Sequence, residues 1–190
     1  IAPFFRAFER MAELEVENER LRIADAKFTD IVGSSKAMKA LRETIKTIAP
    51  SLQAVLILGE TGTGKELVAG LIHELSGRTR GPLVTVNCAA IPRELFESEL
   101  FGHEKGAFTG AISRKTGLME QSHGGTLFLD EIGDLSLDNQ GRILRAVEMG
   151  RFRRVGGVRE LEADLRVVAA TNKDLQVEMR HGRFREDLYH

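Results

Sequence analysis

Eight consecutive residues have the types and the spacing of a loop that binds phosphate groups. They are Gly59, Glu60, Thr61, Gly62, Thr63, Gly64, Lys65 and Glu66, and they follow an apolar run at residues 54–58. Glycines let backbone amides turn toward phosphate oxygens, and the lysine ammonium can reach the outer phosphates. The next residue is usually Ser or Thr, whose hydroxyl ligates magnesium, and Glu66 stands there instead. An ordinary glycine turn is the alternative, but the strand–loop–helix context favours a phosphate site.

Two carboxylates follow a second apolar run, at residues 126–130. Asp130 and Glu131 would emerge at the carboxyl end of a buried strand, which is where α/β sheets bind ligands. We expect Asp130 to hold magnesium, directly or through water, with Glu66 as the other metal-binding carboxylate. We expect Glu131 to orient and deprotonate the attacking water. A surface turn after the strand is the alternative. Together with the glycine loop, the two acids predict a nucleoside triphosphatase that uses Mg²⁺.

Polar residues also end two other apolar runs. Thr171 and Asn172 follow residues 165–170, and Asn87 ends residues 83–87. Asn172 could hydrogen-bond the γ-phosphate or the attacking water. An asparagine after a strand is more often a turn former, so both interpretations stay open for Asn172 and Asn87.

The elements that position these residues form an α/β pattern. Strands are expected at residues 54–58, 83–87, 126–130 and 165–170, and helices from Ser34 or Ser35 to about Ile48, at 64–75 and at 138–149. A short helical segment is expected at 116–122. Apolar runs without alternation, separated by helices, are typical of a parallel sheet covered on both faces. The predicted fold is a parallel-sheet P-loop NTPase domain over residues 27–190.

The first 26 residues carry a different pattern. Phe4, Met11 and Asn18 occupy the a positions of a heptad repeat, and Ala7, Leu14 and Leu21 occupy the d positions. Charged residues fill the positions between. We predict a coiled-coil linker helix that forms a parallel dimer. The alternative is an amphipathic helix that packs on its own domain.

The composition excludes several classes of protein. With 27 basic and 28 acidic residues among 190, the net charge is −1, so the chain has no overall cationic field for nucleic acid or anionic lipid. Hydrophobic residues make up 42%, which is enough for a buried core. A single cysteine, Cys88, favours a reducing compartment. With no apolar run of membrane-span length and no signal peptide, we expect a cytoplasmic protein.

One hexapeptide resembles a known family. Gly106, Ala107, Phe108, Thr109, Gly110 and Ala111 spell GAFTGA, which resembles the sigma-54-interacting loop of bacterial enhancer-binding proteins of the NtrC-like family. These proteins are AAA+ ATPases that activate transcription by sigma-54 RNA polymerase. The likeness runs from residue 28 to residue 190 and includes residues 59–66, 86–88, 99–103, 124–132, 154–157 and 184–189. The family also carries Glu after the loop lysine.

The resemblance implies roles that spacing alone does not give. Asn87 resembles a switch residue that holds Glu131 inactive until the γ-phosphate is sensed, and Thr171 with Asn172 resembles the sensor I segment. Arg185 resembles an arginine finger supplied to the ATP of a neighbouring subunit.

It also implies contacts for nucleotide and partner. Phe108 and Thr109 resemble the tip that touches sigma-54, and residues 154–157 resemble a second pore loop. The adenine is expected near Ile31, Val32 and Gly33.

The implied function is ATP-driven remodelling of the closed promoter complex of sigma-54 RNA polymerase, by a ring that is commonly hexameric. The sequence ends before the helical lid of the family, and DNA binding is expected only through a C-terminal domain that it does not contain. A dimer through the coiled coil would be the resting state that controls ring assembly. Two alternatives stay open: a small-molecule kinase on the same phosphate loop, and a non-catalytic dimerisation module.

Overall fold

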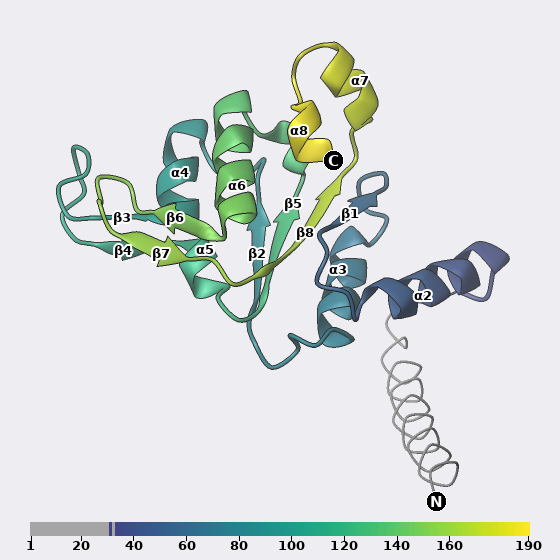
Figure 1. Cartoon of the computed structure of the whole chain (residues 1–190). Helices are drawn as coiled ribbons and strands as arrows, with labels where there is room; N and C mark the ends of the chain where they lie inside the picture. The colour runs from purple at the N-terminus through teal and green to yellow at the C-terminus, as the bar shows by residue number, and fades with distance from the viewer. Residues whose placement is uncertain (1–30, 32) are drawn as a thin grey trace, which may run out of the picture.

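The computed structural model describes residue 31 and residues 33–190, and its centre is a parallel sheet. Four strands lie in the order β1-β8-β5-β2 (Figure 1). Their bounds are β1 (Val55–Leu58), β8 (Arg166–Thr171), β5 (Thr126–Asp130) and β2 (Leu83–Asn87). All three neighbouring pairs are parallel, so the four carboxyl ends meet at one edge. The predicted sheet is confirmed, with the last strand ending at Thr171, one residue later than expected.

Helices cover both faces of this sheet. They are α2 (Lys36–Ile48), α3 (Lys65–Glu74), α4 (Arg93–Phe101), α5 (Leu118–Gln121), α6 (Leu137–Met149), α7 (Leu175–Arg180) and α8 (Glu186–Tyr189), with a 3-10 turn η2 (Ile132–Asp134). One apolar cluster joins α2 and α3 to one face, and a second joins α4, α5, α6 and α7 to the other (Figure 1). The side chain of Ser35 accepts from Met38 N, so Ser35 rather than Ser34 caps α2.

The central strand β5 shows why these runs lack alternation. Leu127 and Leu129 belong to the cluster beneath α4 and α6, whereas Phe128 belongs to the cluster beneath α3. All three side chains are buried, so both faces of the strand need apolar residues. Burying each side chain contributes about 1.5–3 kcal/mol.

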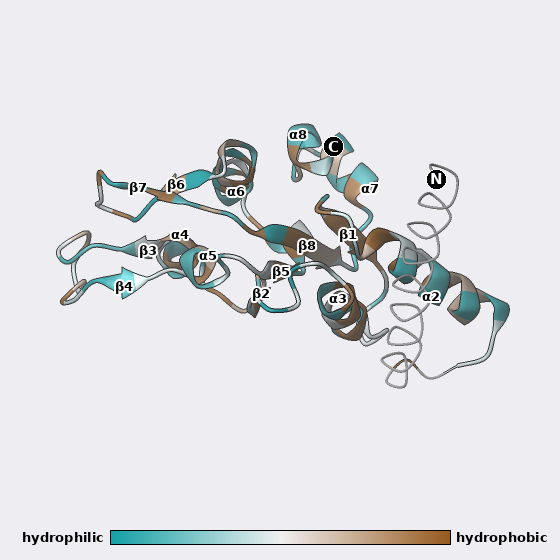
Figure 2. Cartoon of the chain, turned by 60° about the horizontal axis from the view of Figure 1, so that its bottom comes forward, coloured by the Kyte–Doolittle hydropathy of each residue, from teal (hydrophilic) through white to brown (hydrophobic). Residues whose placement is uncertain are grey.

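Two short hairpins protrude from one side of the sheet. One pairs β3 (Gly102–His103) with β4 (Lys115–Thr116), and the other pairs β6 (Arg151–Arg153) with β7 (Glu160–Glu162) (Figures 1 and 2). The sequence pattern did not predict either hairpin or helix α4. The predicted coiled coil at residues 1–26 lies outside the described residues. No helix in the described part of the chain is long and apolar enough to cross a membrane.

The fully buried side chain of Arg166, 1% exposed, joins the sheet to the end of α2. Its guanidinium donates to the carbonyl oxygens of Ile48, Ala49 and Gln53. The bonds to Ile48 and Ala49 satisfy carbonyls at the end of α2 that have no partner within the helix, and the bond to Gln53 fixes the segment before β1. Burial lowers the pKa of this guanidinium below its usual range.

We expect Arg166→Met to lower the free energy of unfolding by about 3 kcal/mol, because the buried carbonyl of Ala49 and the partly buried bonds to Ile48 O and Gln53 O lose this donor. Chemical denaturation measures this change. Arg80→Met, at an exposed arginine, is the matched control and should change stability by less than about 0.5 kcal/mol. A loss below about 1 kcal/mol in Arg166→Met would contradict the assigned role.

Candidate nucleotide site and the protruding loops

Every strand of the sheet delivers a candidate residue to the same edge. The glycine loop follows β1, Thr171 ends β8, Asp130 ends β5 and Asn87 ends β2. Asn87 and Asp130 lie opposite each other in the register of the two strands. Parallel pairing therefore brings together residues that are more than one hundred positions apart in the chain.

The glycine loop has the conformation that its residues predict. Gly62 and Gly64 have φ angles of 80° and 86°, which L side chains rarely adopt, and Gly64 caps the start of α3. The buried ammonium of Lys65 donates to the carbonyl oxygens of Gly59 and Glu60 at 3.1 and 3.2 Å. The lysine therefore lies beneath the loop, where it can contact the anion that the loop encloses.

Glu131 is the most constrained residue of the site. Its φ of 51° is the one positive value found at a non-glycine residue in the part of the chain that the structure describes. Such a conformation costs about 1–2 kcal/mol and concentrates at functional sites. One carboxylate oxygen of Glu131 pairs with Lys65 Nζ at 3.2 Å, and the other accepts from Asn172 N at 3.0 Å.

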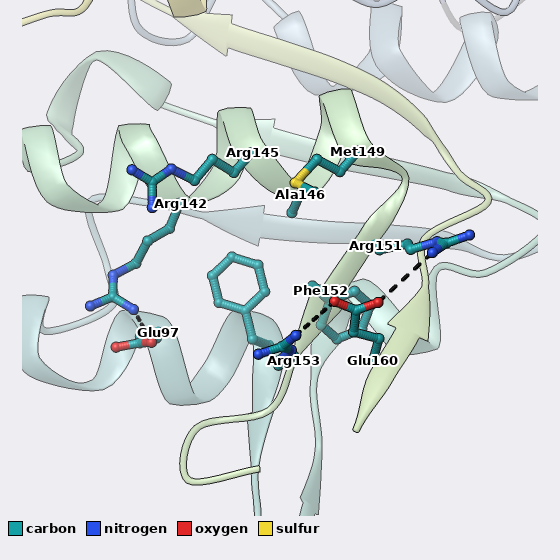
Figure 3. A pocket seen from close by; sticks show the side chains of 10 residues that line it. Glu97, Arg142, Arg145, Ala146, Met149, Arg151, Phe152, Arg153 and Glu160 are labelled. Atoms are coloured by element: carbon teal, nitrogen blue, oxygen red, sulfur yellow. Dashed lines mark hydrogen bonds and ion pairs between the residues drawn. The ribbon is translucent and has the colours of Figure 1, made fainter. Parts of the chain in front are cut away.

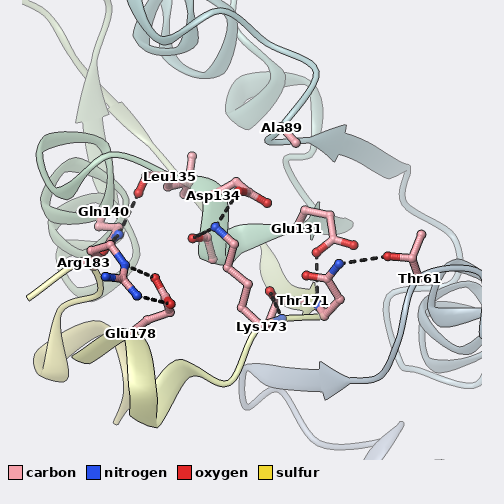
Figure 4. Close-up of polar contacts among 12 residues, drawn as sticks. Thr61, Ala89, Glu131, Asp134, Leu135, Gln140, Thr171, Lys173, Glu178 and Arg183 are labelled. Atoms are coloured by element: carbon pink, nitrogen blue, oxygen red, sulfur yellow. Dashed lines mark hydrogen bonds and ion pairs between the residues drawn. The ribbon is translucent and has the colours of Figure 1, made fainter. Parts of the chain in front are cut away.

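Asn172 connects this carboxylate to the tip of the glycine loop. Its side-chain Nδ2 donates to Thr61 Oγ1 at 2.9 Å, while its backbone N donates to Glu131. Figure 4 shows Glu131 and Thr61 at the two ends of this linkage. Asn172 thus contacts both halves of the site, which favours the sensor interpretation over that of a simple turn former.

The side chain of Asn87 does not contact Glu131. Its Oδ1 accepts from the backbone N of Ala89 and Ala90 at 3.0 and 3.1 Å, which closes a turn after β2. The holding contact expected from Asn87 is made in this structure by Lys65 and Asn172. The following residue, Cys88, is buried, and burial raises the pKa of its thiol to about 12.

The carboxylates fit a magnesium ion of the kind that also binds phosphates. Asp130 Oδ1 accepts from Glu131 N, and Oδ2 makes no hydrogen bond among the described residues. Glu66 is exposed in the first turn of α3. No group of three or more His, Cys, Asp or Glu side chains in the described ranges could enclose a metal alone. Mg²⁺ usually takes one or two carboxylates plus phosphates and waters, so this sparse set is suitable.

The hollow beside the glycine loop does not include the described residues that are expected near the adenine. It has a volume of about 510 Å³ and is lined by Leu58, Gly59 and Glu60 on one side and residues 171–176 on the other. Ile31 is buried in the cluster beneath α2 and α3. Gly33 is exposed, and Val32 lies outside the described residues.

Arg185 is not brought to the glycine loop. Its guanidinium pairs with Asp187, which raises the pKa of Arg185, and its backbone N donates to Gln140 on α6. Its side chain is 43% exposed, so the charge is accessible on the α6 side of the domain.

The sequence analysis missed Lys173. Its Nζ contacts Gly133 O at 3.1 Å and Asp134 Oδ1 at 2.6 Å, and its backbone N donates to Thr171 Oγ1 (Figure 4). Lys173 therefore fixes the segment after β8 to the turn after Glu131. A lysine next to Asn172 and an acid three residues after Glu131 are the signal that could have predicted it.

The two protruding hairpins are joined by Arg154. Its buried guanidinium pairs with Glu120 of α5 at 2.6 Å and with Glu104, before the hexapeptide, at 2.9 Å. The hydrogen bond to Glu120 is the main cause that raises the pKa of Arg154. A Cβ on Gly156 would lie 2.7 Å from the Cβ of Ala107, so a glycine there lets the two loops touch. Residues 104–111 and 154–157 are therefore in direct contact with each other.

The aromatic side chain of the hexapeptide is only partly exposed. Phe108, 41% exposed, packs edge-on against His103 with 5.0 Å between ring centroids. The ring of His103 is oriented by Ser98, whose Oγ lies 2.7 Å from Nδ1. The backbone N of Gly106 donates to Ala111 O, and the backbone N of Ala111 donates to Phe108 O, which closes the loop.

We expect His103→Ala to raise the amide hydrogen exchange of Gly106 and Ala111 about two- to tenfold, because an aromatic pair contributes about 0.5–1.5 kcal/mol. His103→Phe keeps the edge-on contact and should exchange at nearly the wild-type rate. Equal exchange in the alanine and phenylalanine variants would show that His103 does not hold Phe108.

The fold and the site define the class of this domain. A parallel sheet with a glycine loop after β1, a buried lysine, and a carboxylate pair after β5, which is separated from β1 by β8, is that of a P-loop NTPase. The chain belongs to the family described as "Sigma-54 interaction domain", which matches residues 31–190. It is therefore the AAA+ domain of a bacterial enhancer-binding protein.

Individual relatives agree with this assignment. The chain is 54% identical over 161 residues to the anaerobic nitric oxide reductase transcription regulator NorR of Vibrio vulnificus, which covers 85% of this chain and 32% of that protein. It is 50% identical over 182 residues to the transcriptional regulator VasH of Vibrio cholerae, and this match covers 96% of this chain and 34% of that protein. The crystal structure of NtrX from Brucella abortus in complex with ATP is similar, with a TM-score of 0.78 and 42% identity over 95% of this chain and 41% of that one. The chain thus spans about a third of the length of these curated relatives.

Proposed function

We propose that this domain hydrolyses ATP and uses the energy to remodel the closed promoter complex of sigma-54 RNA polymerase. The observation that carries the proposal is the contact of Glu131 with both Lys65 and Asn172 at the carboxyl edge of the sheet. Glu131 is a candidate general base, Lys65 is a phosphate-binding cation, and Asn172 is a polar group that can sense the γ-phosphate. A site that only bound nucleotide would not need a strained carboxylate among them.

Each residue has a role in hydrolysis. The loop amides and Lys65 bind the phosphates, and Glu131 orients and deprotonates the attacking water. Asp130 and Glu66 would hold Mg²⁺, which when bound neutralises charge on the phosphates. When a phosphate group pairs with Lys65, Glu131 loses its ion pair with that lysine and keeps its hydrogen bond from Asn172. Asn87 and Asn172 would then sense the γ-phosphate and transmit its presence to the protruding loops at residues 104–111 and 154–157. The adenine would bind near residues 31–33.

Ring assembly completes the site in this proposal. The exposed guanidinium of Arg185 is suited to reach the phosphates of a neighbouring subunit, because its one carboxylate partner, Asp187, is also exposed. Such surface pairs are weak and can exchange partners. A ring, commonly hexameric in the family, would share its active sites, and a dimer through residues 1–26 would be the resting state.

The hexapeptide loop is the proposed contact with sigma-54. Thr109 is exposed at the tip beside Phe108, with Gly106 and Ala107 before the pair and Gly110 after it. The experiment mixes the intact protein with purified sigma-54 and a transition-state analogue of ATP, then looks for a complex by gel filtration. Thr109→Ala is compared with Thr116→Ala, a matched exposed threonine outside the loop.

A complex that needs both the analogue and Thr109, and that survives Thr116→Ala, supports the proposal. Absence of any complex while ATP is still hydrolysed would mean that the ATPase acts on a different partner. Transfer of phosphate to a metabolite instead of water would mean that the domain is a kinase.

A further inference from the structure

A groove away from the nucleotide site lies between two helices and a protruding hairpin. Its volume is about 410 Å³, and α4, the second half of α6 and the β6–β7 hairpin form its walls (Figure 3). None of the residues that line it contributes to the phosphate site. The β6–β7 hairpin, which contributes to the groove, protrudes from the same side of the sheet as the β3–β4 hairpin (Figure 1).

The floor of the groove is apolar. Phe101 and Phe152 lie with ring centroids 5.8 Å apart, and Ala146 is buried beside them. Met149 extends this floor outward and is 68% exposed. An exposed methionine is flexible and polarisable, so it adapts to an apolar side chain of a partner.

The walls carry an excess of positive charge. Arg142 and Arg145 stand on the α6 side, and Arg151 and Arg153 stand on the hairpin side (Figure 3). The only acids lining the groove are Glu97 and Glu160.

The charges are unevenly paired. Arg142 pairs with Glu97, while Arg151 and Arg153 share Glu160 at 3.8 and 2.8 Å. Arg145 makes no hydrogen bond or ion pair within the ranges that the structure describes. The existing pairs are half-exposed surface pairs of the kind worth about 0–1 kcal/mol, so an incoming carboxylate can replace them at little cost.

We propose that this groove binds an acidic segment of a protein partner. Carboxylates of the segment would pair with Arg145 and with the arginines at the rim, and one apolar side chain would rest on Met149 and the two phenylalanines. Nucleic acid fits less well, because the groove has a volume of only about 410 Å³ and its floor of Phe101, Ala146 and Phe152 has no polar side chain. This interaction does not depend on ATP hydrolysis or on sigma-54.

The test measures binding of a short fluorescein-labelled peptide, in which glutamates flank a leucine and a phenylalanine, by fluorescence anisotropy. The control peptide has glutamine at every glutamate. We expect the acidic peptide to bind at least about tenfold more tightly than the control, and Arg145→Glu to weaken it about tenfold or more. Arg180→Glu, at an exposed arginine of α7 outside the groove, should change the affinity less than about twofold.

Four outcomes overturn the proposal. In the first three, the acidic peptide fails to bind, it binds Arg145→Glu as tightly as the wild type, or a labelled single-stranded DNA binds the groove in place of the peptide. Alternatively, Arg145→Glu could change the sedimentation coefficient while no peptide binds, which would assign the groove to a second copy of the chain. Unfolding curves of Arg145→Glu and Arg180→Glu check that each variant folds. We expect both to fold, because both arginines are exposed.

Discussion

Glu131→Ala is expected to leave ATP binding intact and to slow ATP hydrolysis by about 10²–10⁴-fold, the usual contribution of a positioned general base. Binding persists because the loop amides and Lys65 remain. The variant keeps a Cβ at the φ of 51°, so the backbone strain remains, but it frees Lys65 Nζ from the 3.2 Å contact with the carboxylate. We therefore expect affinity for ATP that is equal to or higher than that of the wild type.

Isothermal titration measures the affinity, and phosphate release measures the turnover. Glu94→Ala, at an exposed acid of α4, is the matched control and should hydrolyse ATP at the wild-type rate. Near-normal turnover in Glu131→Ala would remove Glu131 from the chemistry. Loss of binding would instead make it a structural partner of Lys65.

Arg154→Met is expected to lower the free energy of unfolding by about 2–4 kcal/mol, because Glu120 and Glu104 lose a buried counter-charge. The same change should loosen the two protruding loops. The amides of Glu104 and Val155, whose bonds to Val155 O and Gly102 O join the hairpins, should exchange at least about tenfold faster.

The neighbouring Arg153 provides the control. Its pair with Glu160 is half exposed on both sides, so Arg153→Met should cost less than about 1 kcal/mol. Adding Glu120→Gln to Arg154→Met should recover part of the lost stability, because one unpaired carboxylate is removed. An Arg154→Met protein as stable as Arg153→Met would show that the buried pairs contribute nothing net.

Local patterns in the sequence were sufficient for the sheet and the centre of the site. Each core strand is a continuous apolar run that ends in a chemically distinctive group, so residues 54–66 and 126–131 could be interpreted without distant contacts. Parallel pairing then places all carboxyl ends at one edge, while the strand order and register come from the structure.

Other elements lack such a local signal. Strands β3 and β4 contain two residues each, which is too short for any periodicity to appear. Helix α4 has its buried side chains at Phe96, Leu100 and Phe101 among several charges, and the sequence analysis passed over it.

The tertiary structure alone decided which polar groups meet. Asn172 could have been a turn former, and only the fold places its amide on Glu131 and its side chain on Thr61. Arg166 and Arg154 look like surface cations in the sequence, yet both are buried and bonded to groups far away in the chain. The physical reason is that the burial of apolar side chains follows from their spacing along a single strand or helix. The partner of a buried charge, in contrast, depends on how helices and strands that are distant in the sequence pack together.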